Sequence, residues 1–203
     1  MLWARAMGAY DQGVYCLQLR PFERKHLALA GPWFADADTR RWLGGPAWPR
    51  QMLDWARRPL GEFRAAAETG RYRWLAWDRG TAVGYIDCGT YDRWTTWEGG
   101  PGGRGVISAM SIPAGAISYV VDPALRRRGY CAAMVAAVLA MPELGYIQLF
   151  AAGVEPANVG SADCLRKAGF QPLNPGPDWE GVVCYCRFRH PVTPTEQSCP
   201  ASH

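Results

Sequence analysis

ISYVVDPALRRRGYCAAMVAAVLA, residues 117–140, predicts a strand, a short basic turn and a helix in succession. The strand ends at Asp122-Pro123, because proline cannot donate to a strand ladder. Gly129 then opens a long uncharged run that predicts a helix. The first turn of a helix offers unpaired N–H groups and the positive end of a dipole. Together with the arginines at 126–128, this junction is suited to bind a pyrophosphate.

The whole chain has the composition of one globular domain. It has 203 residues, 49% of them hydrophobic, and a formal net charge of +4, which does not demand a nucleic-acid partner. No apolar stretch is long enough to span a bilayer, and the start of the chain lacks the apolar core of a signal peptide. We expect a cytoplasmic protein with an N-terminal extension over residues 1–13, one domain over 14–189 and a flexible tail over 190–203.

The seven cysteines form neither a disulfide framework nor a zinc pattern, because their number is odd and their spacing matches neither. We therefore expect free thiols, which suit a reducing cytoplasm. The cysteines are Cys16, Cys88, Cys131, Cys164, Cys184, Cys186 and Cys199.

The order of predicted elements indicates a mixed α/β fold with a largely antiparallel central sheet flanked by helices. Residues 72–77 and 82–88 form a predicted hairpin, and residues 91–113, rich in glycine, are expected to be a long loop or lid. The other predicted strands are 14–20, 116–121, 146–152 and 181–188, and the predicted helices are 22–30, 49–58, 62–68, 127–141 and 158–168.

A second junction, VEPANVGSADCLRKAGF at residues 154–170, predicts another strand followed by a helix. Asn158 is a favourable N-cap, and Gly169 is a favourable helix stop. In order and context, these two segments resemble the GNAT superfamily of N-acetyltransferases. Arg126, Gly129 and Cys131 fall on the fixed positions of its acetyl-CoA motif, (Q/R)-x-x-G-x-(G/A), with cysteine in place of a smaller residue.

The resemblance covers residues 15–189 and is nearest the branch that includes ribosomal-protein N-terminal acetyltransferases. It implies a GNAT-like acyl-CoA N-acyltransferase fold. It also implies direct acetyl transfer from acetyl-CoA to a primary amine of a small molecule or a peptide N-terminus. The alternative is a non-catalytic CoA-binding or ligand-sensing protein on the same fold. A nucleic-acid binder is a third hypothesis, but one pyrophosphate accounts for the arginines.

Acetyl-CoA is the implied co-substrate, with no metal. The implied partners are acetyl-CoA and an amine acceptor, without nucleic acid or membrane, and a homodimer is left open. The pantetheine would pair along the strand and contact the second helix, and the pyrophosphate would sit on the loop. The residues expected to bind it are Tyr119, Val120, Val121, Arg126, Arg127, Arg128, Gly129, Tyr130, Cys131, Ala132, Asn158 and Ser161.

The catalytic groups are less clearly indicated. Many family members place a tyrosine where this chain has Leu165, so the general acid is expected to be Tyr119, Ser118 or water. For the general base, the candidates are Asp87 inside an apolar strand, Glu98 in the lid and Glu155 after a strand. The loop tryptophans Trp94, Trp97 and Trp179 are candidate acceptor contacts, because exposed loop aromatics often have a binding role.

Overall fold

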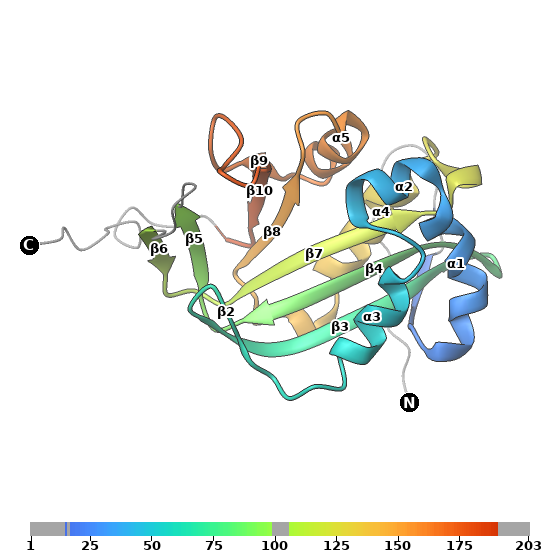
Figure 1. Ribbon diagram of the computed structural model, residues 1–203, viewed down its shortest axis with the longest axis horizontal. Helices are drawn as coiled ribbons and strands as arrows, with labels where there is room; N and C mark the ends of the chain where they lie inside the picture. Colours follow the sequence, from blue (N-terminus) through green and yellow to red (C-terminus); the bar gives the residue numbers. More distant parts are fainter. Residues whose placement is uncertain (1–14, 16, 99–105, 191–203) are drawn as a thin grey trace, which may run out of the picture.

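The computed structural model describes residue 15 and residues 17–98 and 106–190 (Figure 1). The helices are α1 (Leu27–Ala35), α2 (Ala37–Leu43), α3 (Trp48–Trp55), α4 (Tyr130–Leu139) and α5 (Val159–Lys167), with 3-10 turns at Arg24–His26, Pro123–Leu125 and Pro142–Leu144. The strands are β1 (Leu17–Pro21), β2 (Glu62–Phe63), β3 (Ala66–Asp78), β4 (Thr81–Tyr91), β5 (Trp94–Glu98), β6 (Val106–Met110), β7 (Ala114–Val121), β8 (Leu149–Val154), β9 (Gln171–Pro172) and β10 (Val183–Phe188).

One twisted sheet runs in the order β1-β3-β4-β7-β8-β10-β9, with β2 added at the edge of β3. Its neighbouring strands are antiparallel except for β7 and β8, which are parallel. The predicted hairpin is confirmed as β3 and β4, joined at Arg79 and Gly80, which both have positive φ. The expected fold class is therefore correct.

Helices cover both faces of this sheet (Figure 1). Side chains of a strand alternate between faces, so neighbouring residues of β4 serve different cores. Tyr85 packs with residues of α1 and α3, whereas Ile86 packs with residues of α4 and α5. Both side chains are fully buried. The two helix layers thus hold the central strands, and with them β7, in a fixed position.

The helix predicted over residues 62–68 is wrong. These residues form β2, a turn and the start of β3. Arg64 and Ala65 in the turn have φ of 51° and 60°, which a right-handed helix does not allow. Glu68, on the following strand, accepts a hydrogen bond from the Gly61 amide at 2.8 Å and ion-pairs with Arg71. Strand pairing with β4 and this ion pair outweigh the helical propensity of the alanines.

Residues 91–113 are not a structureless lid. Strands β5 and β6 pair across this segment as a separate two-stranded sheet, and residues 99–105 lie outside the described part. The β-forming residues of Trp94–Glu98 account for the strand. The first helix also differs, since α1 begins at Leu27 and is followed by α2, which the sequence pattern did not predict. Asp36 caps α2 by accepting a bond from the Thr39 amide at 3.1 Å.

Two of the cysteines are not free thiols. Cys131 in α4 and Cys164 in α5 form a disulfide with Cα atoms 6.1 Å apart, while Cys88, Cys184 and Cys186 are free. Sequence spacing could not reveal a pair that meets only when the two helices pack together. These two cysteines therefore do not support a reducing compartment. The cytoplasmic location stays a prediction.

The predicted terminal segments fall almost entirely beyond the part of the chain that the structure describes. The predicted N-terminal extension and all of the tail except His190 lie outside the described residues. Within the described part, no helix has the length and apolar character needed to cross a membrane.

Candidate active site

A cleft begins where β7 and β8 part. Pairing joins only Ala114–Ala116 to Leu149–Ala151, although β7 continues to Val121 and β8 to Val154. Beyond this point, β7 has a strand partner only in β4 among the described residues. The backbone groups on its other side are therefore available to an added strand-like ligand. Tyr119, Val120 and Val121, expected to pair with pantetheine, lie in this diverging part.

An anion-binding turn lies at the open end of β7. Arg127 and Gly129 have φ of 63° and 84°, and α4 begins at Tyr130. The Ala133 amide is the one that bonds back to the Gly129 carbonyl, at 3.1 Å, so the amides of residues 130–132 precede the helical ladder. The first turn of α4 contains no acidic residue. The expected pyrophosphate loop thus has the geometry of an anion site.

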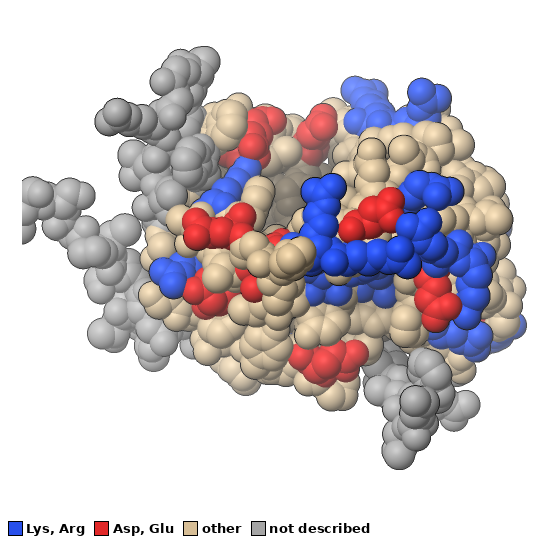
Figure 2. Space-filling model, turned by 60° about the horizontal axis from the view of Figure 1, so that its bottom comes forward, with Lys and Arg blue, Asp and Glu red and all other residues tan. Residues whose placement is uncertain are grey.

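The three arginines of this turn have different surroundings. The Arg126 guanidinium is held by the start of α2, through Asp36, Asp38 at 3.2 Å and the Thr39 hydroxyl at 2.9 Å. Arg127 and Arg128 are exposed and make no ion pair within the described part of the chain. Arg127 and Arg128 are therefore the ones available to an anionic ligand. Elsewhere, Figure 2 shows one face of the molecule on which basic side chains form a band beside a hollow, with acidic side chains on the other side of the hollow.

Gly129 is required by a neighbour within the protein. A Cβ atom at this position would lie 2.8 Å from the Tyr15 hydroxyl, which donates to the Arg128 carbonyl. Tyr130 packs against Tyr15 with ring centroids 5.0 Å apart and donates to Asp78 at 3.0 Å. Gly129 was expected to let the backbone come close to a ligand, which stays a prediction. In the structure, the absence of a side chain at Gly129 makes room for the Tyr15 hydroxyl.

The second junction contacts β7 through a hydroxyl pair. Asn158 caps α5 by accepting from the Ser161 amide at 3.2 Å, as predicted. The Tyr119 hydroxyl lies 2.7 Å from the Ser161 hydroxyl, and burial raises the pKa of Tyr119 to about 12. Ser161 and Leu165 are four residues apart on one face of α5. Leu165 is 0% exposed and belongs to the core.

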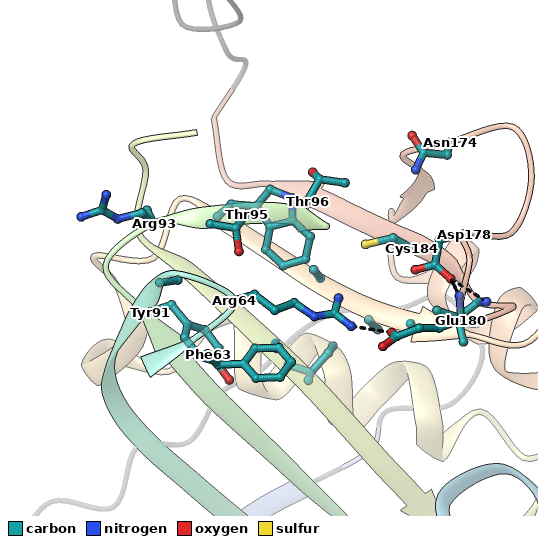
Figure 3. Close-up of a pocket in the computed structure, with 18 of the residues that line it drawn as sticks. Phe63, Arg64, Tyr91, Arg93, Thr95, Thr96, Asn174, Asp178, Glu180 and Cys184 are labelled. Carbon is teal, nitrogen blue, oxygen red and sulfur yellow. Dashed lines mark hydrogen bonds and ion pairs between the residues drawn. The ribbon is translucent and has the colours of Figure 1, made fainter. Parts of the chain in front are cut away.

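A cavity of about 450 Å³ lies where β7 and β8 part (Figure 3). Its floor is formed by residues next to the strand divergence, Ala116, Ile117, Ala151, Ala152 and Gly153. Its walls carry aromatic and charged side chains from the β2–β3 turn region, from the end of β4 through the start of β5, and from the loop before β10. These are Phe63, Arg64, Tyr91, Arg93, Trp94, Asp178, Trp179 and Glu180. An acceptor in this cavity would therefore meet a ligand in the cleft at Ala116 and Ala152.

The three predicted base candidates do not line this cavity within the described residues. Asp87 is half-buried beside a small hollow with Trp55 and Arg73. It accepts from the Ser118 hydroxyl at 2.6 Å and from Tyr85 at 2.8 Å. Burial raises the pKa of Asp87 to about 6, although both hydrogen bonds lower it. Glu155 is exposed, and the side chain of Glu98 lies outside the described part.

Asp178 and Glu180 are the acidic residues among the described ones that line the cavity, and the sequence prediction missed them. They flank Trp179, which was predicted as an acceptor contact and does line the cavity, as Trp94 does. In the sequence, the signal that could have indicated them was a pair of acidic residues on either side of a loop tryptophan, Trp179. Among the described residues, no group of three or more His, Cys, Asp or Glu is placed to hold a metal.

The sequence matches the acetyltransferase (GNAT) domain over residues 17–171. The chain belongs to the GNAT acetyltransferase family. It is an acetyl-CoA-dependent N-acetyltransferase. No curated protein sequence matches the chain.

Solved GNAT structures share this fold at low identity. An aminoglycoside acetyltransferase in complex with coenzyme A is 16% identical, covering 85% of this chain and 95% of that one, with a TM-score of 0.58. RimL, a ribosomal-protein alpha-N-acetyltransferase in a disulfide with coenzyme A, is 15% identical, covering 85% and 93%, with a TM-score of 0.58. The GNAT domain of S. lividans PAT is 17% identical, covering 85% and 90%, with a TM-score of 0.57.

Proposed function

We propose that this enzyme transfers an acetyl group from acetyl-CoA directly to a primary amine, of a small molecule or a peptide N-terminus, bound in the cavity. The observation that carries the proposal is that three features are continuous along one strand. The anion-binding turn, the parting strands and the cavity follow one another along β7. The neighbours support the acceptor class, since their names specify an aminoglycoside and a ribosomal protein as substrates.

The described residues fit acetyl-CoA. The pyrophosphate would bind the amides of Tyr130–Ala132, with Arg127 and Arg128 adding charge. The pantetheine would pair with the open side of Tyr119–Val121, between β7 and the start of α5 at Asn158 and Ser161. The thioester would then end at the floor of the cavity, where backbone amides of β7 can polarise its carbonyl.

The chemistry needs three proton movements. The acceptor arrives as an ammonium ion and must lose one proton before its nitrogen attacks the thioester carbon. A C–N bond forms, the C–S bond breaks, and the nitrogen loses a second proton. The thiolate takes up one proton, so one proton is released for each acetyl group transferred. Proximity in the cleft supplies much of the rate, because both reactants are held together.

Asp87 is the base candidate that the geometry supports best. Ser118 donates to Asp87 at 2.6 Å and lies two residues from Ala116 on the same face of β7. Ala116 lines the cavity. A proton taken from the amine by the Ser118 oxygen would release the Ser118 proton to Asp87. With a pKa of about 6, Asp87 is ionised at neutral pH and ready to accept it.

Tyr119 is the corresponding acid candidate. Its hydroxyl reaches α5 at Ser161, one helical turn before Leu165. A tyrosine of the strand thus contacts the same helix that carries Leu165. Because burial raises its pKa to about 12, Tyr119 stays protonated and can donate to the departing thiolate.

Turnover is the direct test. Acetyl-CoA is incubated with a panel of amines, and thiol release and the acetylated product are measured together. The proposal requires both, in equal amounts. A non-catalytic CoA-binding protein, the alternative that Leu165 favours, would bind CoA and release no thiol with any amine.

CoA binding is tested separately with two matched glycine variants. Gly129 and Gly80 have nearly equal φ, 84° and 85°, so an alanine is strained at either position. Only at Gly129 would the new Cβ meet Tyr15, whereas nothing lies within 4 Å at Gly80. Calorimetry should show weaker CoA binding in Gly129→Ala and unchanged binding in Gly80→Ala. Equal affinities in both variants would place the pyrophosphate elsewhere.

A further inference from the structure

The walls of the acceptor cavity are aromatic, and the charges on them are balanced. Phe63 and Trp179 line it and are partly open to solvent, with 53% and 49% of their surface exposed. Among the described residues, the charged side chains that line it are two basic and two acidic ones: Arg64, Arg93, Asp178 and Glu180. A polycationic acceptor would need an excess of acidic groups, which the described walls do not supply. The cavity suits an uncharged or zwitterionic molecule with an apolar group.

One ion pair spans this cavity. Arg64 comes from the turn between β2 and β3, and Glu180 from the loop before β10, 116 residues later. The Arg64 guanidinium donates to the Glu180 carboxylate at 2.5 Å, and Figure 3 shows the two side chains extended toward each other across the cavity. Arg93 instead points away and pairs with Asp92 at 2.7 Å. Arg64 is therefore the cation that faces the cavity.

The local backbone conformation restricts the position of Arg64 and of Glu180. Arg64 and Ala65 occupy the left-handed region without being glycine, a conformation that costs free energy and is concentrated at functional sites. The Arg64 side chain also lies over the Phe63 ring, 5.0 Å from its centroid. On the other wall, the Asp178 carboxylate accepts from the amides of Glu180 and Val182 at 2.9 and 3.1 Å. This turn holds Asp178 and Glu180 side by side.

We infer that this pair is a receptor for a zwitterion, and that the acceptor is an α-amino acid with an aromatic or apolar side chain. This inference rests on the proposed function. The carboxylate of the acceptor takes the place of Glu180 on Arg64, whose fork of N–H donors matches it. Its ammonium group then lies against Asp178 and Glu180, and its side chain lies among the aromatic rings. Binding thus breaks the ion pair between Arg64 and Glu180 and forms two ion pairs between the protein and the ligand.

The arrangement also positions the nitrogen for reaction. The same cavity is floored by Ala116 and Ala152, where the thioester would end. An amino group one carbon away from the carboxylate is held close to the carboxylate, so binding on Arg64 limits where the nitrogen can lie. A peptide N-terminus or a simple amine lacks this carboxylate and loses that contact.

The test compares four acceptors of the wild-type enzyme: L-phenylalanine, L-phenylalaninamide, phenethylamine and kanamycin. We expect kcat/KM for phenylalanine to exceed that of each of the others by about tenfold or more, the effect of one charge-assisted contact. Transfer that is equal among the first three, or greatest to kanamycin, would overturn the zwitterion inference while leaving acetyl transfer established.

The variant Arg64→Gln should lose about tenfold in kcat/KM for phenylalanine and less than twofold for phenethylamine. Arg24→Gln removes the same charge from an exposed ion pair with Asp54 and should change neither. The double variant Arg64→Glu with Glu180→Arg keeps an ion pair across the cavity but reverses its direction. It should also lose the preference for phenylalanine. A retained preference would mean that the pair only supports the loops.

Binding gives a readout that does not depend on turnover. Calorimetry with CoA present should detect phenylalanine binding to the wild type and its loss in Arg64→Gln, with thermal unfolding confirming that the variant is folded. If phenylalanine binds through Arg64 but no acetyl group moves, the proposed function fails and the receptor stands. If phenylalanine does not bind while another amine is acetylated, only the receptor fails.

Discussion

Asp87 shares its two carboxylate oxygens between the hydroxyls of Ser118 and Tyr85. Asp87→Asn keeps the shape and removes the base, so kcat/KM should fall by about 100-fold at neutral pH. The wild-type profile should rise with a midpoint near pH 6, and this limb should vanish in the variant. The loss should shrink at high pH, where the amine deprotonates without help. Glu155→Gln, at an exposed rival, should match the wild type, and a loss there would move the base to Glu155.

The same residue should make folding stability depend on pH. Its pKa is raised from 3.8 to about 6, so the folded state favours the protonated form. The stability from this preference is fully present below pH 3.8 and is lost as pH rises through 6. Between these limits, wild type should lose up to about 3 kcal/mol relative to Asp87→Asn, from 1.36 kcal/mol per pKa unit. Urea unfolding of both proteins at pH 4 and pH 7 measures this change. If the difference in free energy of unfolding between wild type and Asp87→Asn is the same at both pH values, the pKa of Asp87 is not raised in the folded state.

Tyr119→Phe removes the hydroxyl that lies 2.7 Å from Ser161. If Tyr119 protonates the departing thiolate, kcat should fall by about 100-fold, while the affinity for CoA changes little. Leu165→Met is the matched control, because methionine conserves the volume of this buried side chain. It should leave transfer intact. A Tyr119→Phe variant with full activity would assign the proton to solvent.

Individual residues differ in how far the sequence could predict them. Asn158 and Gly169 act through neighbours in the chain, so their roles at the ends of α5 were visible in the sequence. Asp178 and Glu180 could not be assigned in this way. They lie opposite Arg64, more than a hundred residues earlier, which reaches Glu180 only after the sheet has formed.

Helices α4 and α5 are joined by the disulfide between Cys131 and Cys164, 33 residues apart in the sequence. Closing a loop of this size restricts the unfolded chain, so losing the bond should reduce the free energy of unfolding by about 3–4 kcal/mol. Denaturant unfolding with and without a reductant measures this contribution. The double variant Cys131→Ser with Cys164→Ser should be insensitive to the reductant, and a wild type that is equally insensitive would contradict the bond.

Elements with a strong local pattern were predicted well, and those that depend on distant pairing were not. The β3–β4 hairpin and α5 follow from alternation, turn residues and caps. Residues 62–68 have helical propensity but form strands, because β4 offers pairing and Glu68 is held by Arg71. The glycines in 91–113 concealed the β5–β6 pair, since a glycine-rich sequence says nothing about the strands on either side of it.

The molecule as a whole should respond to its co-substrate along β7. If pantetheine pairs with the open side of this strand, CoA should slow amide hydrogen exchange in residues 117–121. The β3–β4 hairpin, already paired on both sides, serves as the internal control and should change little. Thermal unfolding should shift upward with CoA concentration, because the ligand binds only the folded state. Protection confined to α4 would mean that the strand is not used.

The short pairing of β7 with β8 also has a consequence for the life of the protein in a cell. An open strand edge is a template on which other chains can pair, and proteins usually cover such edges. If pantetheine pairs with this edge as proposed, the cover is a metabolite that each reaction consumes and releases. When the pool of CoA falls, more molecules expose the edge, and aggregation and proteolysis have more to act on. The abundance of the enzyme would then follow the supply of the compound that it uses.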